Sequence, residues 1–152
     1  MARQQDLFRT ETSSSETPGK KMVAHIDGGA RGNPGPAGYG VVIEDGGGKT
    51  LAELSRYLGH RTNNVAEYSG LLAALEKALD LGGGNLRVMS DSELLVRQMN
   101  GQYKVKSPDL RPLYEEARRL SRKFASFRIE HVRREQNRAA DKLANRAMDE
   151  GA

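Results

Sequence analysis

Three short apolar runs near the start of the chain are separated only by glycine-rich segments that have no room for a helix. The runs occupy residues 22–27, 39–44 and 50–58; between them lie residues 28–38, a loop rich in glycine and proline, and the turn 45–48. Antiparallel strands can be joined by connections this short, whereas parallel strands need a crossover of a dozen or more residues. The sequence therefore predicts a meander of three antiparallel strands.

After the meander the pattern alternates between helices and strands. Three candidate capping residues, Thr62, Asn63 and Asn64, precede apolar residues at helical spacing that continue to about residue 81, where three glycines end the pattern. We expect further strands over 86–91 and 127–132, and helices over 92–100, 108–123 and 136–148, the last with Asn137 as a candidate cap. This order predicts an α/β fold: one five-stranded mixed sheet, a three-stranded antiparallel meander plus two parallel strands, with helices on both faces.

The beginning of the chain differs in composition from the rest. Residues 1–21 are mostly polar or charged, and Leu7-Phe8 is their main apolar pair. So few apolar groups cannot offset the entropy lost on ordering. We predict a disordered polar tail over residues 1–21 and one folded domain over residues 22–150. Leu7-Phe8 is either part of an untethered tail or a short docking motif.

Composition narrows the partners and the kinds of site. Lysine and arginine number 24 against 20 aspartates and glutamates, and this net charge of +4 slightly favours a polyanionic partner. The absence of cysteine excludes disulfides and thiolate metal sites. No apolar stretch approaches the ~20 residues that a membrane-spanning helix needs. We expect a cytoplasmic monomer that has no contact with membranes.

Four carboxylates lie at or near the ends of predicted strands and helices. Asp27 ends the first strand, and Asp91 ends the fourth. Glu67 lies in the first turns of the long helix, and Asp141 lies early in the last helix. Ligand groups gather at the strand ends and neighbouring helix termini of open α/β sheets. The four acids could therefore converge from distant parts of the sequence.

Converging carboxylates need a cation, because they otherwise repel one another and raise each other's pKa. Oxygen ligands without histidine or cysteine suit Mg²⁺, or Mn²⁺ in its place. Such a site can hold two ions about 3.5–4 Å apart that stabilise a phosphodiester displacement. Each acid taken singly also has a structural explanation, because acids stabilise helix N-termini and aspartate favours turns.

Local sequence around the four acids resembles type 1 ribonuclease H. The first strand and the segment after it read Asp27-Gly28-Gly29-Ala30-Arg31-Gly32-Asn33-Pro34-Gly35-Pro36-Ala37-Gly38-Tyr39-Gly40, which is similar to that family's opening signature. Three further strings follow in the family's order: Thr62-Asn63-Asn64-Val65-Ala66-Glu67, Ser90-Asp91-Ser92 and Asn137-Arg138-Ala139-Ala140-Asp141-Lys142-Leu143-Ala144. The resemblance covers about residues 22–148.

The resemblance implies a ribonuclease H-like fold and an endoribonuclease that cuts the RNA strand of RNA–DNA hybrids. Asp27, Glu67, Asp91 and Asp141 match the family's catalytic, metal-binding carboxylates. Asp27 and Asp91 would share one Mg²⁺ ion across the scissile phosphate with Glu67 beside them, and Asp141 would lie on the other ion. Hydrolysis would leave a 5′-phosphate and a 3′-hydroxyl.

Substrate contacts are implied for six further residues. Gly28 and Gly29 would let the main chain approach the 2′-hydroxyls in the minor groove, because glycine has no side chain to intervene. The alternative for these glycines is a tight turn. Asn33, Thr62, Asn63 and Asn64 are similar to family residues that contact the two strands. Helix capping is the alternative for the last three.

Two features depart from the family's pattern. Many members carry a basic protrusion rich in Lys and Trp, where this chain has only Tyr103-Lys104-Val105-Lys106. Hybrid binding could then rely on the basic run Arg118, Arg119, Arg122 and Lys123, which could equally be the solvated face of a helix. The family's loop histidine before the last helix is also missing. His131 is the nearest histidine, and Arg134 could act as a cation near the departing phosphate.

Two other functions remain compatible with these residues. Carboxylate nucleases on similar sheets also resolve DNA junctions or cut RNA duplexes, although a loop that reads 2′-hydroxyls argues against a substrate made only of DNA. A hybrid-binding module without catalysis is the second alternative. It would be favoured if one acid were lost, and all four are present.

Overall fold

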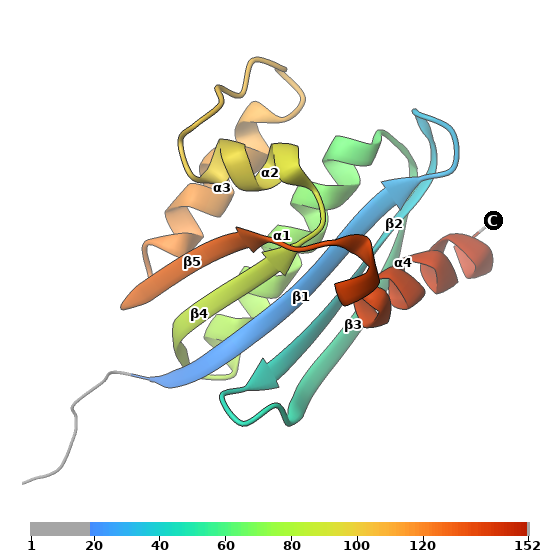
Figure 1. Ribbon diagram of the computed structural model, residues 1–152. Helices are drawn as coiled ribbons and strands as arrows, with labels where there is room; N and C mark the ends of the chain where they lie inside the picture. The colour runs from blue at the N-terminus through green and yellow to red at the C-terminus, as the bar shows by residue number, and fades with distance from the viewer. Residues whose placement is uncertain (1–18, 152) are drawn as a thin grey trace, which may run out of the picture.

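The computed structural model describes residues 19–151 (Figure 1). The elements follow in the order β1 (Lys20–Ala30), β2 (Gly35–Asp45), β3 (Thr50–Arg61), α1 (Asn63–Asp80), β4 (Gly83–Ser90), α2 (Glu93–Met99), α3 (Arg111–Ser121), β5 (Ser126–His131), the short 3-10 turn η2 (Arg134–Gln136) and α4 (Arg138–Gly151). None of the helices in this range is long and apolar enough to cross a membrane.

The five strands form one sheet in the order β3-β2-β1-β4-β5. β2 pairs antiparallel with both β1 and β3, whereas β4 pairs parallel with both β1 and β5. The mixed sheet expected from the element order is therefore confirmed. β1 is the central strand, with an antiparallel neighbour on one side and a parallel neighbour on the other.

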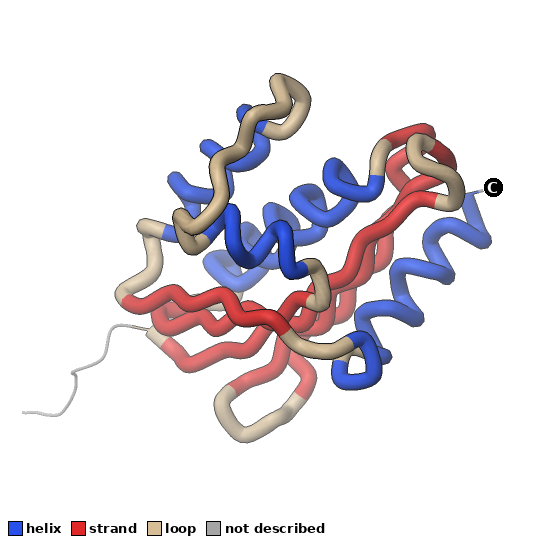
Figure 2. The backbone as a smooth tube through the Cα atoms, turned by 45° about the horizontal axis from the view of Figure 1, so that its top comes forward, coloured by secondary structure: helices blue, strands red, loops and turns tan. Residues whose placement is uncertain are grey.

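Helices cover both faces of the sheet, as predicted. α4 packs against β1, β2 and β3 on one face, and α1 packs on the other face with α2 and α3 beside it (Figure 2). The main core lies between the sheet and α1. Met22, Ala24 and Ile26 alternate along β1 and are buried there, together with Leu71 and Leu75 of α1.

The loop between the first two strands is shorter than the predicted residues 28–38. β1 continues to Ala30 and β2 begins at Gly35, so the connection is only residues 31–34. Gly28 pairs with Tyr39 inside the ladder. A Cβ on Gly28 would lie 2.5 Å from the backbone of Ala66 in α1, so this glycine allows the helix to approach the sheet.

Several other predicted boundaries shift by a few residues. Lys20 and Lys21, assigned to the polar tail, belong to β1 because they pair with the beginning of β4. Residues 1–18, where most of the predicted tail lies, are outside the described residues. Three glycines were expected to end the long helix. Only Gly82, with a φ of 84°, lies between α1 and β4, because Gly83 is already the first residue of β4.

The starts of the last two helices also differ from the prediction. α3 begins at Arg111 rather than at residue 108, and the preceding Leu110 has no side-chain capping bond. α4 begins at Arg138, after the 3-10 turn. Asn137 was expected to cap this helix, but its side chain instead donates a hydrogen bond to the carbonyl of Ile26 in β1.

Gly40 in β2 is predicted to be essential for the packing of α4 on the sheet. A Cβ at this position would overlap the carbonyl oxygen of Ala140 and lie 2.6 Å from the Cβ of Leu143. We expect Gly40→Ala to lower the free energy of unfolding by about 1–3 kcal/mol, the usual cost of overpacking. Urea denaturation measures this change. Gly47→Ala, in an exposed turn with no such contact, is the matched control and should be nearly neutral; equal effects at both glycines would contradict the packing role.

Candidate metal centre and substrate cleft

The four predicted carboxylates come from four separate elements and line the same cleft. Asp27 lies in the last third of β1, and Asp91 follows directly on the last residue of β4. Because β1 and β4 are parallel neighbours, their carboxyl ends meet at one edge of the sheet. Glu67 is in the second turn of α1, and Asp141 is in the first turn of α4. The two helices on opposite faces thus each contribute one acid.

Two of the four acids, Asp27 and Glu67, have pKa values well above those of exposed carboxyl groups. Burial raises the pKa of Asp27, and a side-chain hydrogen bond with Asp141 and the charges of Asp91 and Asp141 raise this pKa further. Burial also raises the pKa of Glu67 to about 7, with a further contribution from the charge of Asp91. The site therefore resists holding all its negative charges at once, which is the electrostatic condition that a bound cation would relieve.

One carboxylate oxygen of Asp91 also lacks a partner. Its Oδ2 is buried and has no hydrogen-bond partner among the described residues. The nearest cation is Arg134, whose Nε lies 3.8 Å away on a mostly exposed side chain. A buried carboxylate oxygen without a partner is costly, and a metal ion would satisfy it.

The donor set fits a hard divalent cation, although the ligands are not drawn together in advance. All four side chains offer carboxylate oxygens, the ligands that Mg²⁺ prefers. Within residues 19–151, no three acidic or histidine side chains already form a compact ligand group. Binding of an ion would therefore have to bring the carboxylates closer together.

Ser92 belongs to one of the sequence motifs but was given no role there, and the structure shows its contact with one of the four acids. Its Oγ donates a hydrogen bond to Oε1 of Glu67 at 3.0 Å and lowers the pKa of that carboxyl against the larger effect of burial. The same hydroxyl caps α2 by accepting a bond from the amide of Leu95. Ser92 therefore fixes the orientation of Glu67 relative to the end of β4.

Arg31 closes the wall of the cleft between the β1–β2 turn and α4. Its guanidinium forms an ion pair with Asp149 at 2.6 Å and lies 3.3 Å from Oδ1 of Asn145. Arg31 and Asn145 both line the cleft. The sequence could not reveal the ion pair of Arg31 or its place in the cleft wall, because Arg31 and its partners lie more than a hundred residues apart.

Five of the six predicted substrate contacts line one of two hollows, and Asn33 lines neither. Gly28, Gly29, Asn63 and Asn64 line the cleft with the acids. Thr62 lies in a separate hollow with Pro34, His60 and Arg61, and its Oγ1 caps α1 by accepting a bond from the amide of Val65.

Asn33 and Asn63 hold the β1–β2 turn against the start of α1. The amide of Asn63 donates to Oδ1 of Asn33 at 3.1 Å, and Oδ1 of Asn63 accepts from the amide of Ala30 at 2.6 Å. The side chain of Asn63 does not cap α1, whereas that of Asn33 accepts from the first amide of the helix. Together the two bonds fix the glycine-rich end of the hairpin beside the cleft.

The two candidates for the missing loop histidine occupy different places. His131 is the exposed last residue of β5 and is not among the residues that line the cleft. Arg134, three residues later in the 3-10 turn, does line the cleft and faces Asp91. The cation at this side of the site is therefore an arginine.

Two residues of the basic run, Arg118 and Arg119, lie in α3 and have partners in the same helix. Arg119 forms two hydrogen bonds with Glu116, and Arg118 donates to the hydroxyl of Tyr114. Such pairs are typical of the solvated face of a helix. In the loop before α3, Tyr103 is half exposed and packs against the guanidinium of Arg97.

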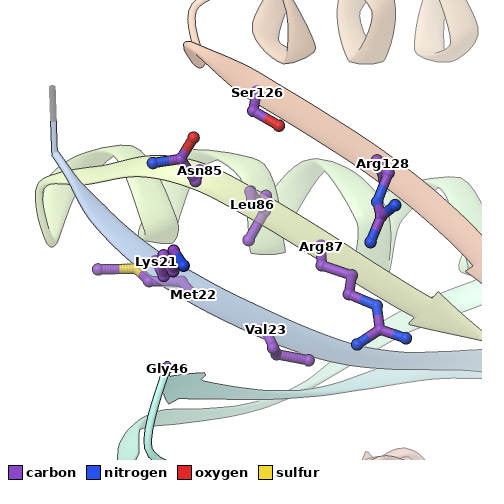
Figure 3. A pocket seen from close by; sticks show the side chains of 9 residues that line it. All are labelled: Lys21, Met22, Val23, Gly46, Asn85, Leu86, Arg87, Ser126 and Arg128. Carbon is purple, nitrogen blue, oxygen red and sulfur yellow. The ribbon is translucent and has the colours of Figure 1, made fainter. Parts of the chain in front are cut away.

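A second hollow lies at the other end of the sheet, where β1, β4 and β5 begin. Figure 3 shows Lys21 from β1, Asn85 and Arg87 from β4 and Arg128 from β5 around it. Its lining contains no aspartate or glutamate. It therefore lacks the ligands for a hard cation, which are concentrated in the cleft at the carboxyl ends of the strands.

The metal-free protein is predicted to lose stability as the pH rises. Glu67 titrates near 4.5 when unfolded and at about 7 when folded, and the pKa of Asp27 is shifted in the same direction. The folded state therefore binds more protons in this window, and its free energy of unfolding falls with increasing pH. In EDTA, we expect the melting temperature to decrease between pH 4.5 and 7, and Asp27→Asn to weaken this decrease.

The control for this pH dependence is Glu53→Gln, an exposed position on β3 far from the cleft, which should leave the slope unchanged. Added Mg²⁺ should raise the melting temperature more at pH 8 than at pH 5, because the deprotonated acids are its ligands. A melting temperature that rises with pH in EDTA would contradict the account of the site.

Comparisons with known proteins agree with this geometry. Residues 25–147 match the family described as reverse transcriptase-like. The bifunctional protein Rv2228c of Mycobacterium tuberculosis is 50% identical over 133 residues, which make up 87% of this chain and 36% of that protein. Ribonuclease HI of Halobacterium salinarum is 43% identical over 132 residues, or 87% of this chain and 66% of that protein. The chain thus spans about a third of the first relative and about two thirds of the second.

Solved structures give the same assignment. The N-terminal RNase H domain of Rv2228c superposes with a TM-score of 0.84 at 49% identity, covering 86% of this chain and 95% of that one. LC11-RNase H1, solved in complex with an RNA/DNA hybrid, superposes with a TM-score of 0.81 at 45% identity, covering 86% of this chain and 98% of that one. The chain belongs to the reverse transcriptase-like family and, within it, to the type 1 ribonuclease H proteins.

Proposed function

We propose that this protein is an endoribonuclease that hydrolyses the RNA strand of RNA–DNA hybrids and leaves 5′-phosphate and 3′-hydroxyl ends. The observation that carries the proposal is the convergence of Asp27, Glu67, Asp91 and Asp141 on one cleft. The relative LC11-RNase H1, which was solved with a hybrid, supports the choice of substrate. All four acids come from one copy of the chain, so the protein would act as a monomer.

The carboxylates would hold two Mg²⁺ ions, with Mn²⁺ as a substitute. Asp27 and Asp91 would share one ion beside Glu67, and Asp141 would bind the other next to Asp27. Bound in this way, the ions would lower the pKa of the attacking water and neutralise the charge that develops on the phosphate. The protein's own contribution is to keep the carboxylates in a partly buried cleft, and Ser92 orients one of them.

Recognition of RNA would depend on the backbone at the end of β1. A Cβ on Gly29 would lie 3.7 Å from Oδ1 of Asn63, between the strand and a side chain that lines the cleft. Without it, the main chain and Asn63 can both approach the shallow minor groove, where the 2′-hydroxyls lie. Gly28 serves a different purpose, because a side chain there would strike α1 instead.

Asp27→Asn and Asp91→Asn are predicted to abolish Mg²⁺-dependent cleavage of a labelled hybrid. Each change removes one negative ligand and leaves a side chain of the same shape, so the fold should persist. We expect the rate to fall by about a thousandfold or more, a loss of roughly 4 kcal/mol in transition-state stabilisation. Circular dichroism checks folding, and Glu76→Gln on the exposed face of α1 is the control. Either aspartate variant cutting at the wild-type rate would show that the site is assigned wrongly.

Arg134 and His131 are predicted to differ in their effect on turnover. Arg134 faces Asp91 in the cleft and would stabilise negative charge on the departing phosphate. We expect Arg134→Ala to lower turnover by about tenfold, or roughly 1.4 kcal/mol. His131→Ala should stay within about twofold of the wild type, since its side chain is outside the cleft. Steady-state kinetics with the hybrid compares them, and the reverse order of effects would refute the role of Arg134.

A further inference from the structure

Asn137, between the 3-10 turn and α4, is one of the few polar side chains that are fully buried in the described part of the protein. Only 1% of its surface is exposed. Its Nδ2 donates a hydrogen bond of 2.8 Å to the carbonyl oxygen of Ile26, 111 residues earlier in the chain. The bond joins the central strand of the sheet directly to the beginning of the last helix.

Both ends of this connection are attached to a carboxylate of the cleft. Ile26 is followed directly by Asp27. At the other end, the carbonyl of Asn137 accepts a hydrogen bond of 3.0 Å from the amide of Asp141, in the first turn of α4. One residue therefore ties the backbone beside Asp27 to the helical turn that carries Asp141.

Core packing alone does not account for an asparagine at this position. Its Oδ1 is buried and has no hydrogen-bond partner among the described residues. An unpaired buried polar atom costs free energy that an apolar side chain of similar size would avoid. The useful part of the side chain is the donor that reaches Ile26.

The other two acids are held by different means. Asp91 extends from the end of β4, and Glu67 is oriented by the hydroxyl of Ser92. Neither arrangement includes Asn137. A change at Asn137 should therefore move Asp141 relative to Asp27 and leave the other two carboxylates in place.

We propose that Asn137 is a positioning residue that sets the separation of Asp27 and Asp141, and with it the placement of the carboxylates that would hold the two ions. The inference rests on the proposed function, because it assumes that the cleft binds divalent ions. Asn137 itself is not among the residues that line the cleft and would touch neither ion nor substrate. It would act through Asp141.

A double-mutant cycle measured by Mn²⁺ binding to the metal-free protein tests this role. The variants are Asn137→Ala, Asp141→Asn and the two together, and electron paramagnetic resonance of free Mn²⁺ gives the affinities. We expect Asn137→Ala to weaken binding by about tenfold in the wild-type background. In the Asp141→Asn background it should have no further effect beyond about twofold, because residues that act through one another are not additive.

Two further variants separate positioning from general stability. Asn137→Ser keeps a residue that suits the start of a helix, but its hydroxyl is too short to reach Ile26, so it should behave like the alanine variant. Leu75→Ala empties part of the core beneath α1, away from the cleft, and should destabilise the protein without changing Mn²⁺ affinity. With the hybrid, Asn137→Ala should lower kcat, leave KM unchanged and recover partly at higher Mn²⁺.

The possible failures are distinguishable. Unchanged Mn²⁺ affinity in both Asn137 variants, or the same loss in both backgrounds of the cycle, would overturn the positioning role and leave the metal site standing. An equal loss of affinity in Leu75→Ala would also overturn it. If Asp27→Asn binds Mn²⁺ as the wild type does, the metal site itself is wrong and the inference falls with it.

Discussion

The parallel pairing of β1 with β4 is the contact on which the rest of the site depends. It brings the ends of two strands that β2, β3 and α1 separate in the sequence to one edge of the sheet, and with them Asp27 and Asp91. The antiparallel partner β2 then presents Gly40 beside Asp27, where the missing side chain lets α4 lie close to the sheet. Gly28 does the same for α1 on the other face. Strand pairing and two close helix contacts thus place four acids around one cleft.

This arrangement stores electrostatic repulsion, since the folded state keeps the acids partly buried near one another. Burial is the largest cause of the raised pKa values of Asp27 and Glu67, and neighbouring carboxylates raise them further. A bound divalent cation would favour the charged forms of both acids. Stability and function are in opposition here, because removing one charge should stabilise the metal-free protein and destroy the proposed activity. Contacts such as those of Ser92 and Asn137 keep the acids oriented despite the repulsion.

Much of the fold could be predicted from the sequence because its signals are local. Apolar periodicity and glycine-rich connections gave the element order, and the position of each acid at the end of an element indicated their convergence. The errors arose where tertiary contacts decide. Gly28 was assigned to a loop because its contact with Ala66 is not visible in the chain, and Asn137 was expected to cap a helix because nothing local reveals Ile26 as its partner. Likewise, only the structure shows that Arg134 and not His131 lines the cleft.

The most direct test of the central claim is strand-specific cleavage by the wild-type protein. An RNA–DNA hybrid with a labelled RNA strand, an RNA duplex and a DNA junction are incubated with Mg²⁺ or with EDTA, and the product ends are mapped. The account predicts internal cuts in the RNA strand of the hybrid, with 5′-phosphate and 3′-hydroxyl ends, in Mg²⁺ only. It predicts much slower cleavage of the RNA duplex and none of the junction. Cleavage in EDTA, or a junction cut as fast as the hybrid, would contradict it.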